Sequence, residues 1–329
     1  MRRILQLALI GGLLVFLMLL ACSKEIHYSV TSSVRSFSKA TANTTVRVVQ
    51  HSAGKTLVPV HPERVVILHG FVWEDAIAVG VKPIGAPLKK WVSLLQLAPS
   101  QSQGVVDVDY LPTNIEKVLA LKPDLILGWF ELQKDIYPLL SHIAPTVLIG
   151  IKSARDWKDH FMQVAEALNK TEIAQKVLAN YHSRLQKFKA TGSDRLSKTP
   201  ISVIGPYSEN CRVFSWEKNS FSKGILESAG ITVKSAPSPL MLGKLGLSTI
   251  SWERLDIIDA NIIFVTRSYF GTMEEHQTAF KGLQAIPFWS RLKSVQQGKV
   301  HEVGVYWVGN GPKAANRVLD DLFKYLLNS

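Results

Sequence analysis

The stretch from Asn114 to Trp129, N-I-E-K-V-L-A-L-K-P-D-L-I-L-G-W, is repeated later in the chain from Ser251 to Thr266, S-W-E-R-L-D-I-I-D-A-N-I-I-F-V-T. Each copy places a glutamate, Glu116 or Glu253, near the start of an expected short helix and then enters an apolar strand. In both copies the glutamate stands eight positions before the residue that precedes the strand. Because the copies lie more than a hundred residues apart, we interpret them as corresponding parts of two similar lobes rather than as units of a solenoid.

A second pair of similar segments supports two lobes. Ala78-Val-Gly-Val is followed by Ala86-Pro, and Ser228-Ala-Gly-Ile is followed by Ala236-Pro, each six positions after the glycine. In both segments the glycine comes directly after an expected helix, where a left-handed residue ends many helices. We therefore expect a similar helix-to-strand turn in each lobe.

Around these repeats, apolar strands alternate with helical segments, which predicts an α/β fold with parallel-rich sheets. The expected strands are 46–49, 55–60, 65–68, 83–86, 125–127, 146–149, 201–204, 262–264 and 300–305, and the expected helices are 74–79, 135–143, 156–168, 221–229 and 313–327. Residues 52–54 are expected to form the turn of a hairpin between the first two strands.

A long helix is expected from Thr171 to about Ala190, because its apolar residues recur at the spacing of one helical face. It falls midway between the two repeats, so we interpret it as the connection between two lobes, the alternative being a crossover helix inside one domain. The predicted organisation is an N-terminal lobe at 46–168, a connecting helix at 169–192 and a C-terminal lobe at 193–329, with a ligand cleft between the lobes.

Residues 1–22 have the features of an export signal, with Arg2 and Arg3 preceding an apolar run from Leu5 to Leu20. The sequence Leu19-Leu-Ala-Cys22 resembles the lipobox of bacterial lipoproteins, which predicts cleavage and acylation at Cys22. The alternative is a transmembrane anchor, for which the apolar run is short. Residues 23–45 are rich in Ser and Thr and are expected to form a flexible tether.

The whole chain carries a net charge of +12, or about +10 once the two signal arginines are removed. This charge favours an acidic ligand or an anionic membrane surface, the alternative being a solvated surface rich in Lys and Arg. No basic run is concentrated enough to predict nucleic-acid binding. Apart from Cys22 the chain has one cysteine, Cys211, which would then have no disulfide partner and is expected to be buried.

Motifs of catalysis and metal binding are missing from the sequence. It contains no H-E-x-x-H, G-x-S-x-G or C-x-x-C motif, and its nine histidines show no ligand spacing. Gly309-Asn-Gly-Pro-Lys-Ala fits a dinucleotide-binding pattern, but too little chain follows it for the second strand of such a site, so we expect a tight turn into the last helix. We predict a protein that is not an enzyme and has no cofactor.

Aromatic and cationic side chains follow the expected strands, at the sheet edge where open α/β sheets bind ligands. The predicted ligand-binding residues are Trp73, Trp129, Arg212, Trp216, Arg267, Tyr269 and Trp307, with His69, Trp91 and Tyr207 also at this edge. For each tryptophan a place in the core is an equal alternative, whereas an arginine is rarely buried unless it is paired. Arg would pair with carboxylate or hydroxamate oxygens, and the aromatic rings would cover the apolar body of a large chelate.

Glu116 and Glu253 occupy matching positions on early helical turns. A glutamate in the first turn of a helix is favoured by the helix dipole, which is one explanation. The other is a pair of acidic contacts, one on each lobe, that dock on basic sockets of a partner.

Taken together, several segments resemble the iron-siderophore substrate-binding proteins of ABC importers, in the cluster that also contains cobalamin- and haem-binding proteins. The matching segments are Pro62-Glu-Arg-Val-Val, Ala78-Val-Gly-Val-Lys-Pro-Ile-Gly, the first repeat from Asn114, Ile143-Ala-Pro-Thr, Ile225-Leu-Glu-Ser-Ala-Gly-Ile, Ser251-Trp-Glu-Arg-Leu, Ile286-Pro-Phe-Trp and Gly298-Lys-Val. The resemblance extends over residues 57–327. The resemblance implies two Rossmann-like lobes joined by one backbone helix with little hinge motion, and it implies that Glu116 and Glu253 pair with arginines of the membrane permease.

The sequence therefore predicts a monomeric, lipid-anchored receptor of the cell envelope that delivers a ferric siderophore to an ABC permease and its ATPase. The iron would be held by the siderophore and not by protein ligands. Alternative ligands are cobalamin, haem or a bare ferric chelate such as citrate, and haem would need an axial ligand from Tyr207, Tyr269 or His69. Alternative roles are a ligand-binding sensor lipoprotein and an exported two-lobe enzyme, for which the sequence shows neither a flavin site nor a nucleophile.

Overall fold

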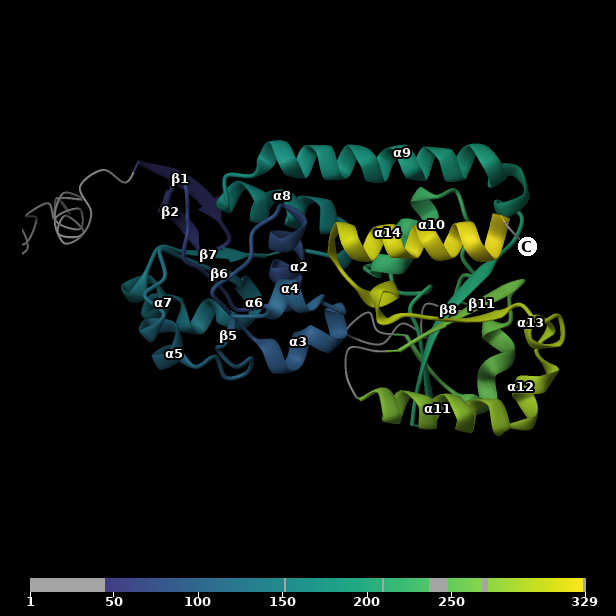
Figure 1. Cartoon of the computed structure of the whole chain (residues 1–329). Helices are drawn as coiled ribbons and strands as arrows, with labels where there is room; N and C mark the ends of the chain where they lie inside the picture. Colours follow the sequence, from purple (N-terminus) through teal and green to yellow (C-terminus); the bar gives the residue numbers. More distant parts are fainter. Residues whose placement is uncertain (1–44, 151, 209, 237–247, 268–271, 328–329) are drawn as a thin grey trace, which may run out of the picture. The chain divides into compact units, whose positions relative to one another are not determined.

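The computed structural model describes residues 45–150, 152–208, 210–236, 248–267 and 272–327, without the side chains of residues 193–195. These residues form two α/β lobes (Figure 1). The predicted signal, the lipidation site at Cys22, nearly all of the tether and Tyr269 lie outside the described residues. Within the described part of the chain, no helix combines the length and the apolar character that crossing a membrane requires.

The N-terminal lobe is built on a parallel sheet with the strand order β5-β4-β3-β6-β7. Its strands are β3 (Val65–Ile67), β4 (Gly85–Ala86), β5 (Val106–Asp107), β6 (Leu125–Trp129) and β7 (Thr146–Ile149). The apolar residues of β3 and most of β6 are buried, as a parallel sheet covered on both faces requires. The predicted hairpin is confirmed as the antiparallel pair β1 (Val46–His51) and β2 (Gly54–Pro59).

Helices cover this sheet and carry several of the residues that concern the ligand site. They are α2 (Gly70–Ala78), α3 (Leu88–Leu95), α4 (Pro99–Ser102), α5 (Ile115–Ala120), α6 (Phe130–Gln133), η2 (Lys134–Ile136), α7 (Tyr137–Ile143), η3 (Ala154–Asp156) and α8 (Trp157–Ala167). The sequence pattern predicted α2 only from residue 74, whereas the helix begins four residues earlier, directly after the His69 N-cap.

The C-terminal lobe has a mixed sheet with the strand order β10-β9-β8-β11-β12. Parallel pairing joins β8 (Ile201–Tyr207), β11 (Ile262–Thr266) and β12 (Val300–Val303). Antiparallel pairing joins β9 (Asn210–Val213) to β8, and β10 (Thr249–Ser251) to β9. The other elements are α10 (Phe221–Ser228), η5 (Trp252–Ile258), α11 (Met273–Ala285), α12 (Pro287–Arg291), α13 (Lys293–Gln296), η6 (Val305–Val308), α14 (Gly311–Leu322) and the π-helical η7 (Phe323–Leu327).

The internal repeat is visible in the pairing of the strands. Val65 lies opposite Leu125 in the first lobe, and Ile201 lies opposite Ile262 in the second. The predicted glycine turns are confirmed as well, with φ values of +82° at Gly80 and +76° at Gly230. The second copy departs from the first in one respect, because Glu253 lies on the 3-10 helix η5 whereas Glu116 lies on an α-helix.

The long helix α9 (Thr171–Leu196) packs against both lobes (Figure 1). Ala174, in its first turns, belongs to the core of the N-terminal lobe, whereas Tyr181, Leu185 and Phe188 belong to the core of the C-terminal lobe. The helix continues six residues beyond the predicted end near residue 190. One continuous helix thus contributes to both cores, as the connecting interpretation requires.

A second contact between the lobes is made by the start of α14, which packs against α2 and α8. The Glu74 Oε1 atom accepts a hydrogen bond from the backbone N–H of Ala314 at 2.8 Å. Beside it, the Asp75 Oδ2 and His160 Nδ1 atoms lie 2.6 Å apart, and the Asn310 Nδ2 atom lies 3.2 Å from the same ring nitrogen. We call this buried polar cluster, formed by Glu74, Asp75, His160 and Asn310, the interlobe joint.

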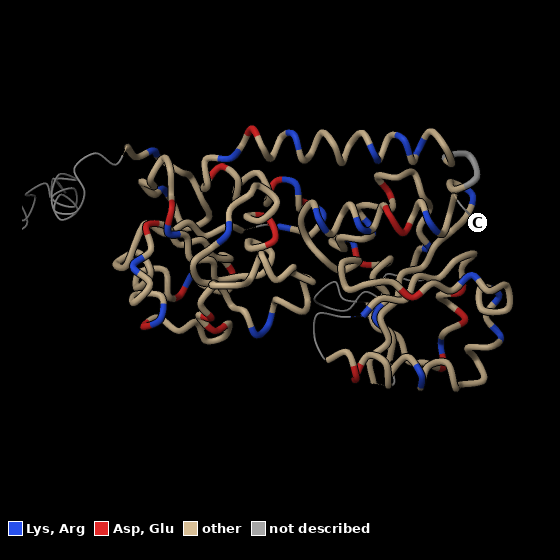
Figure 2. Tube along the Cα trace, viewed as in Figure 1, with Lys and Arg blue, Asp and Glu red and all other residues tan. Residues whose placement is uncertain are grey.

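Charged residues of both signs are distributed along both lobes (Figure 2). Cys211 is buried as predicted, and burial raises the pKa of its thiol to about 12. It therefore behaves as a small core residue and not as a nucleophile.

Candidate functional site

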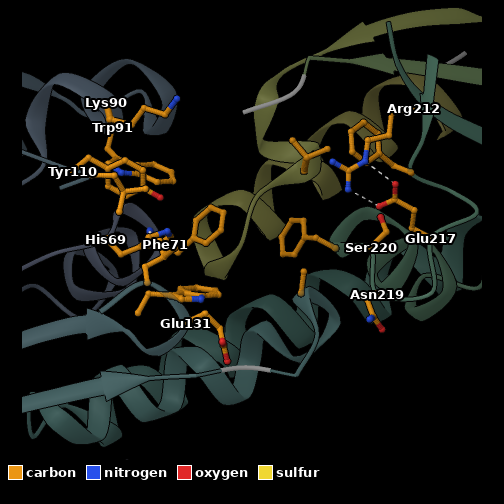
Figure 3. Close-up of a pocket in the computed structure, with 17 residues that line it drawn as sticks. His69, Phe71, Lys90, Trp91, Tyr110, Glu131, Arg212, Glu217, Asn219 and Ser220 are labelled. Atoms are coloured by element: carbon orange, nitrogen blue, oxygen red, sulfur yellow. Dashed lines mark hydrogen bonds and ion pairs between the residues drawn. The ribbon is translucent and has the colours of Figure 1, made fainter. Parts of the chain in front are cut away.

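A cavity of about 570 Å³ lies between the lobes and is lined by residues of both (Figure 3). The lining residues are His69, Phe71, Lys90, Trp91, Tyr110, Leu111, Trp129, Glu131, Leu132 and Ala154 from the N-terminal lobe, and Arg212, Phe214, Glu217, Asn219, Ser220, Phe221 and Val308 from the C-terminal lobe. Its volume lies in the range of pockets that enclose a small-molecule ligand.

The N-terminal side of the cavity is a cluster of aromatic rings around His69, which we call the aromatic wall: His69, Phe71, Trp91, Tyr110 and Trp129. The ring centroid of His69 lies 4.7 Å from that of Trp129 and 4.9 Å from that of Trp91. Centroid distances of this size are typical of favourable aromatic packing. The wall therefore offers a largely apolar, pre-formed surface to the body of a ligand.

His69 occupies the centre of this wall as the N-cap of α2. Its Nδ1 atom accepts a hydrogen bond from the backbone N–H of Phe71 at 3.2 Å. Burial, and secondarily the proximity of His160, lowers the pKa of His69 to about 3. The ring is therefore neutral near pH 7 and, with Nδ1 as acceptor, carries its proton on Nε2. A neutral imidazole can donate one hydrogen bond from the wall without adding charge.

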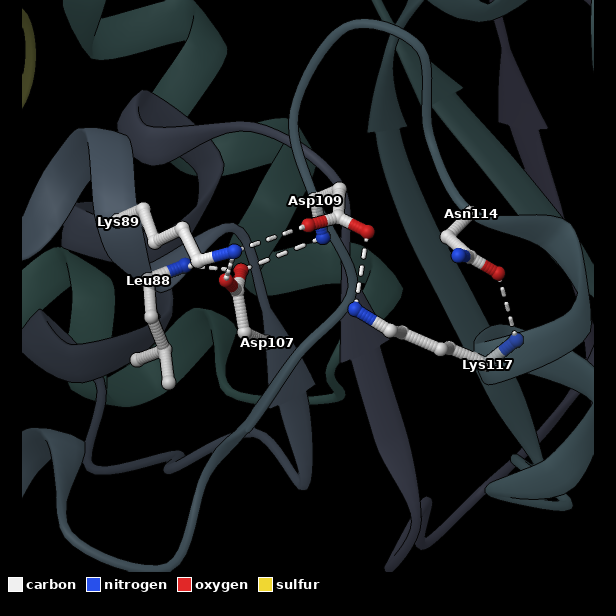
Figure 4. A network of polar contacts seen from close by, with 6 residues as sticks. All are labelled: Leu88, Lys89, Asp107, Asp109, Asn114 and Lys117. Atoms are coloured by element: carbon white, nitrogen blue, oxygen red, sulfur yellow. Dashed lines mark hydrogen bonds and ion pairs between the residues drawn. The ribbon is translucent and has the colours of Figure 1, made fainter.

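Tyr110 and Leu111 reach the cavity from a loop that polar contacts hold in place (Figure 4). The Asp107 Oδ1 atom accepts hydrogen bonds from the backbone N–H groups of Leu88 and Asp109. The Asp109 carboxylate accepts a hydrogen bond from Lys117 Nζ at 2.9 Å, and that interaction is the first cause of the lowered pKa of Asp109. Lys117 lies on α5 beside Glu116, so one network fixes both the cavity loop and the helix of the first predicted docking glutamate.

The C-terminal side of the cavity has a polar surface, formed by the β8–β9 hairpin and the turn that follows it. Arg212, in the middle of β9, forms two parallel hydrogen bonds with Glu217, from Nε to Oε1 at 2.6 Å and from Nη2 to Oε2 at 2.9 Å. Asn219 and Ser220 extend this polar surface to the start of α10 (Figure 3).

Two of the seven predicted ligand-binding residues, Trp129 and Arg212, line the cavity, and so do His69 and Trp91. Arg267 does not line it, and its Nη1 atom lies 3.6 Å from the sulfur of Met273. Tyr207 is exposed, and its hydroxyl donates to Thr249 Oγ1. Tyr269 lies outside the described residues.

The structure places Trp73, Trp216 and Trp307 in the cores of the lobes, which corrects the prediction that they face the ligand. Their exposed fractions are 0%, 3% and 0%. Trp307 stacks on Phe264 at 4.4 Å and donates from its indole nitrogen to Asp321. The physical reason is that a ring following a strand can turn toward the sheet-covering helices as easily as toward the sheet edge, and the apolar area buried in the core favours the former.

Several cavity residues were not predicted from the sequence: Phe71, Lys90, Tyr110, Leu111, Glu131, Leu132, Ala154, Phe214, Glu217, Asn219, Ser220, Phe221 and Val308. A signal existed for Tyr110, which follows β5, but that strand has two residues and shows no recognisable alternation. For Glu217 no signal existed, because its pairing with Arg212 depends on the hairpin and turn that bring them together.

Glu116 and Glu253 are both exposed, one on each lobe. Both stand in the first turn of their helices, so the helix-dipole explanation applies to both. Among the residues that the structure describes, no cluster of three or more His, Cys, Asp or Glu side chains could hold a metal ion.

Comparison with known proteins gives a consistent result. The family model "Periplasmic binding protein" matches residues 65–304. The chain is 30% identical to the probable siderophore-binding lipoprotein YfiY of Bacillus subtilis, over 97% of this chain and 98% of that protein. It is 26% identical to the Fe(3+)-citrate-binding protein YfmC of the same organism, over 86% of each chain. Among solved structures, Staphylococcus aureus SirA complexed with staphyloferrin B superposes with a TM-score of 0.70 at 23% identity, over 85% of this chain and 98% of that one.

Proposed function

The chain belongs to the periplasmic binding protein family, and we propose that it is the substrate-binding component of an ABC importer that captures a ferric siderophore between its lobes. The observation that carries this proposal is the interlobe cavity of about 570 Å³, with the aromatic wall on one side and, on the other, hydrogen-bonding side chains beside Phe214 and Phe221. Such a surface can enclose a chelate whose outside is part apolar and part polar. The names of the relatives, one a probable siderophore-binding lipoprotein and one a ferric-citrate-binding protein, agree with it.

The proposed role needs binding and release but no reaction. In this proposal the siderophore supplies all ligands to the iron, and the protein contacts only the outside of the complex. The aromatic wall would cover the apolar part of the chelate, while His69 Nε2, Tyr110 and Ser220 would offer hydrogen bonds to its oxygens.

The proposed role also requires an attachment to the membrane and a contact with the permease. Acylation of Cys22 would hold the protein at the cell envelope, and residues 23–45 would give it reach. Glu116 and Glu253, exposed on different lobes, would then pair with basic residues of the permease, so that both lobes contact the importer at once.

Ligand capture is tested by isothermal titration of the full-length protein in mild detergent with ferric trihydroxamates, ferric citrate, haem and cobalamin. Saturable binding of a ferric siderophore, with a dissociation constant in the micromolar range or below, is the expected result. Binding of haem or cobalamin alone would replace the substrate, and binding of none of these would contradict the proposal.

Delivery is tested separately by changing Glu116 and Glu253 to Ala in a strain whose growth depends on the bound siderophore. Iron uptake should fall in each single variant and fall further in the double variant, while the affinity for the ligand remains unchanged. Glu274, a glutamate in the first turn of α11, provides a matched control, because Glu274→Ala changes the same residue type in the same helical position. A loss of ligand affinity, or normal uptake in the double variant, would contradict the docking role.

A further inference from the structure

On the polar side of the cavity, the positive charge of Arg212 is offset by the carboxylate of Glu217. Arg212 supplies the only guanidinium among the lining residues that the structure describes. Two hydrogen bonds, at 2.6 and 2.9 Å, join it to Glu217 in the parallel, fork-like arrangement that is the strongest form of this contact. The positive charge that would attract an anionic ligand is thus matched by a carboxylate 2.6 Å away.

This pair is built into the fold and does not depend on a chance meeting of two surface side chains. The backbone of Arg212 is held on both sides, opposite Gly205 in β8 and opposite Thr249 in β10. The Glu217 side chain is 7% exposed, and its Oε1 atom also accepts from the backbone N–H of Ser248 at 3.3 Å. Since Glu217 is nearly buried, breaking the pair would leave a desolvated carboxylate without its partner, which is costly.

Outside this pair, the described lining residues carry one cation and one carboxylate. The described lining residues include two cations, Lys90 and Arg212, and two carboxylates, Glu131 and Glu217. Glu131 is exposed and lies 3.6 Å from Lys134, so the solvent screens much of its charge. His69 adds no charge, because burial lowers its pKa to about 3. A strongly anionic chelate would need several cations to replace its hydration, and beside Arg212 the described lining offers one, Lys90.

We propose that Glu217 is a specificity-determining residue, which neutralises Arg212 and thereby selects ferric complexes of net charge near zero, such as trihydroxamates, over anionic carboxylate or catecholate complexes. This inference rests on the proposed function, since it specifies the ligand class of the same cavity. It also revises the role expected for Arg212. Instead of capturing a ligand carboxylate, its guanidinium is occupied by a carboxylate of the protein.

The experiment uses one ferric trihydroxamate in three forms that differ only at one end. A free terminal amine makes the complex cationic, its acetylation makes the complex neutral, and its succinylation makes the complex anionic. Ferric citrate serves as an unrelated anionic complex. For the wild-type protein we expect the neutral form to bind about tenfold or more tightly than the succinylated form, because the anionic end would lose hydration while the guanidinium of Arg212 is already occupied by Glu217.

The variant Glu217→Gln should release the charge of Arg212 into the cavity. Its affinity for the succinylated form and for ferric citrate should rise about tenfold, while its affinity for the neutral form changes little. Glu227→Gln is the matched control, because Glu227 is also paired with an arginine, Arg155, but does not line the cavity. It should leave the preference for the neutral form intact.

The double variant Arg212→Gln, Glu217→Gln separates a charge effect from a folding effect. Because both charges are removed together, its preference among the three forms should return to that of the wild-type protein. Thermal unfolding should show a cooperative transition for every variant, which confirms that each one folds. A wild-type preference for anionic forms, or a Glu217→Gln variant that folds without gaining affinity for them, would overturn the inference while leaving siderophore binding in place. Failure of the folded wild-type protein to bind any ferric complex would instead overturn the proposed function.

Discussion

In the N-terminal lobe the chain passes from β3 almost directly into α2, whereas in the C-terminal lobe it passes from β8 into the antiparallel strand β9 before it reaches α10. The short connection in the first lobe places His69 and Phe71 at the sheet edge, beside Trp91 and Trp129. The hairpin in the second lobe places Arg212 and the turn after it at the corresponding edge. Two copies of one fold thus present the aromatic wall on one side of the cavity and, on the other, the Arg212–Glu217 pair beside two phenylalanine rings, Phe214 and Phe221.

This difference shows how a repeated fold acquires two unlike surfaces. The central strand pairs β3–β6 and β8–β11 keep the same register, because any change would move their apolar residues out of the core. The connections that follow β3 and β8 differ between the lobes, and the one after β8 adds residues of its own to the core, among them Cys211, Val213 and Trp216. The ligand chemistry of the two sides of the cavity is therefore set largely by these two connections.

The largest expected effect is a loss of stability, and it distinguishes Trp307 in the core from Trp129 in the aromatic wall. Trp307→Leu should lower the free energy of unfolding by about 3–5 kcal/mol, because the buried ring stacks on Phe264 and donates a hydrogen bond to Asp321. Trp129→Leu should change stability less but weaken ligand binding about tenfold or more, because its half-buried ring lines the cavity. Urea unfolding measures the change in stability and isothermal titration the change in ligand affinity. If Trp129→Leu lost more stability, or Trp307→Leu more affinity, the assignment of the two rings to cavity and core would be wrong.

The next largest effect concerns the interlobe joint, which holds the two sides of the cavity in place. Burial, and then the neighbouring Asp75, raises the pKa of Glu74 to about 8, although the Ala314 N–H, Lys313 and Arg317 act in the opposite direction. A carboxyl whose folded pKa lies above its ordinary value of 4.5 contributes stability that is complete below about pH 4.5 and is lost as the pH rises toward about 8.

Glu74→Gln should therefore remove this dependence on pH. We expect the wild-type protein to lose about 2–4 kcal/mol of unfolding free energy between pH 5 and 8 through this group, and the variant to lose correspondingly less. Urea unfolding at a series of pH values gives the two slopes. Identical slopes would mean that Glu74 is ionised in the folded protein.

A smaller effect tests how tightly the aromatic wall is packed. A Cβ atom at Gly70 would come within 2.0 Å of the Trp91 ring, so Gly70→Ala must displace the ring or the start of α2. We expect a loss of about 1–3 kcal/mol together with weaker ligand binding. Gly224→Ala, in α10 of the other lobe, is the control, because its nearest neighbour is the Arg155 side chain at 3.3 Å. Equal effects of the two substitutions on ligand binding would show that the wall is not tightly packed.

The smallest effect concerns the acid side of the stability profile. A histidine whose folded pKa is depressed from 6.5 to about 3 contributes stability that is present above about pH 6.5 and is lost as the pH falls toward about 3. His69→Gln should reduce the loss of stability between pH 6.5 and 5 by about 1–2 kcal/mol. Thermal unfolding of both proteins across this range measures the difference. If the two proteins lose the same stability, His69 is protonated in the folded protein.

The sequence allowed most of the parallel strands, several helices and the two glycine turns to be predicted because each depends on neighbours along the chain, whereas α3 and α11 were not predicted. Apolar periodicity marks β6, β11 and α9, and the glycines mark the ends of α2 and α10. The same periodicity could not reveal β9 and β10, since short antiparallel strands with mixed residues resemble a loop. It also could not divide the tryptophans between core and cavity, because both positions follow a strand.

For this protein, the sequence by itself determined the two-lobe α/β organisation, the connecting helix and the family, since these follow from local periodicity and from motifs distributed along the chain. The tertiary structure decided which rings face the ligand, that Arg212 is neutralised by Glu217, and that Glu74 is buried against α14 of the other lobe. Each of these depends on contacts between separate elements, and the electrostatic consequence of a side chain depends on its burial and its partner. The charge of the binding site is therefore a property of the folded arrangement, although the charge of the chain can be counted from its residues.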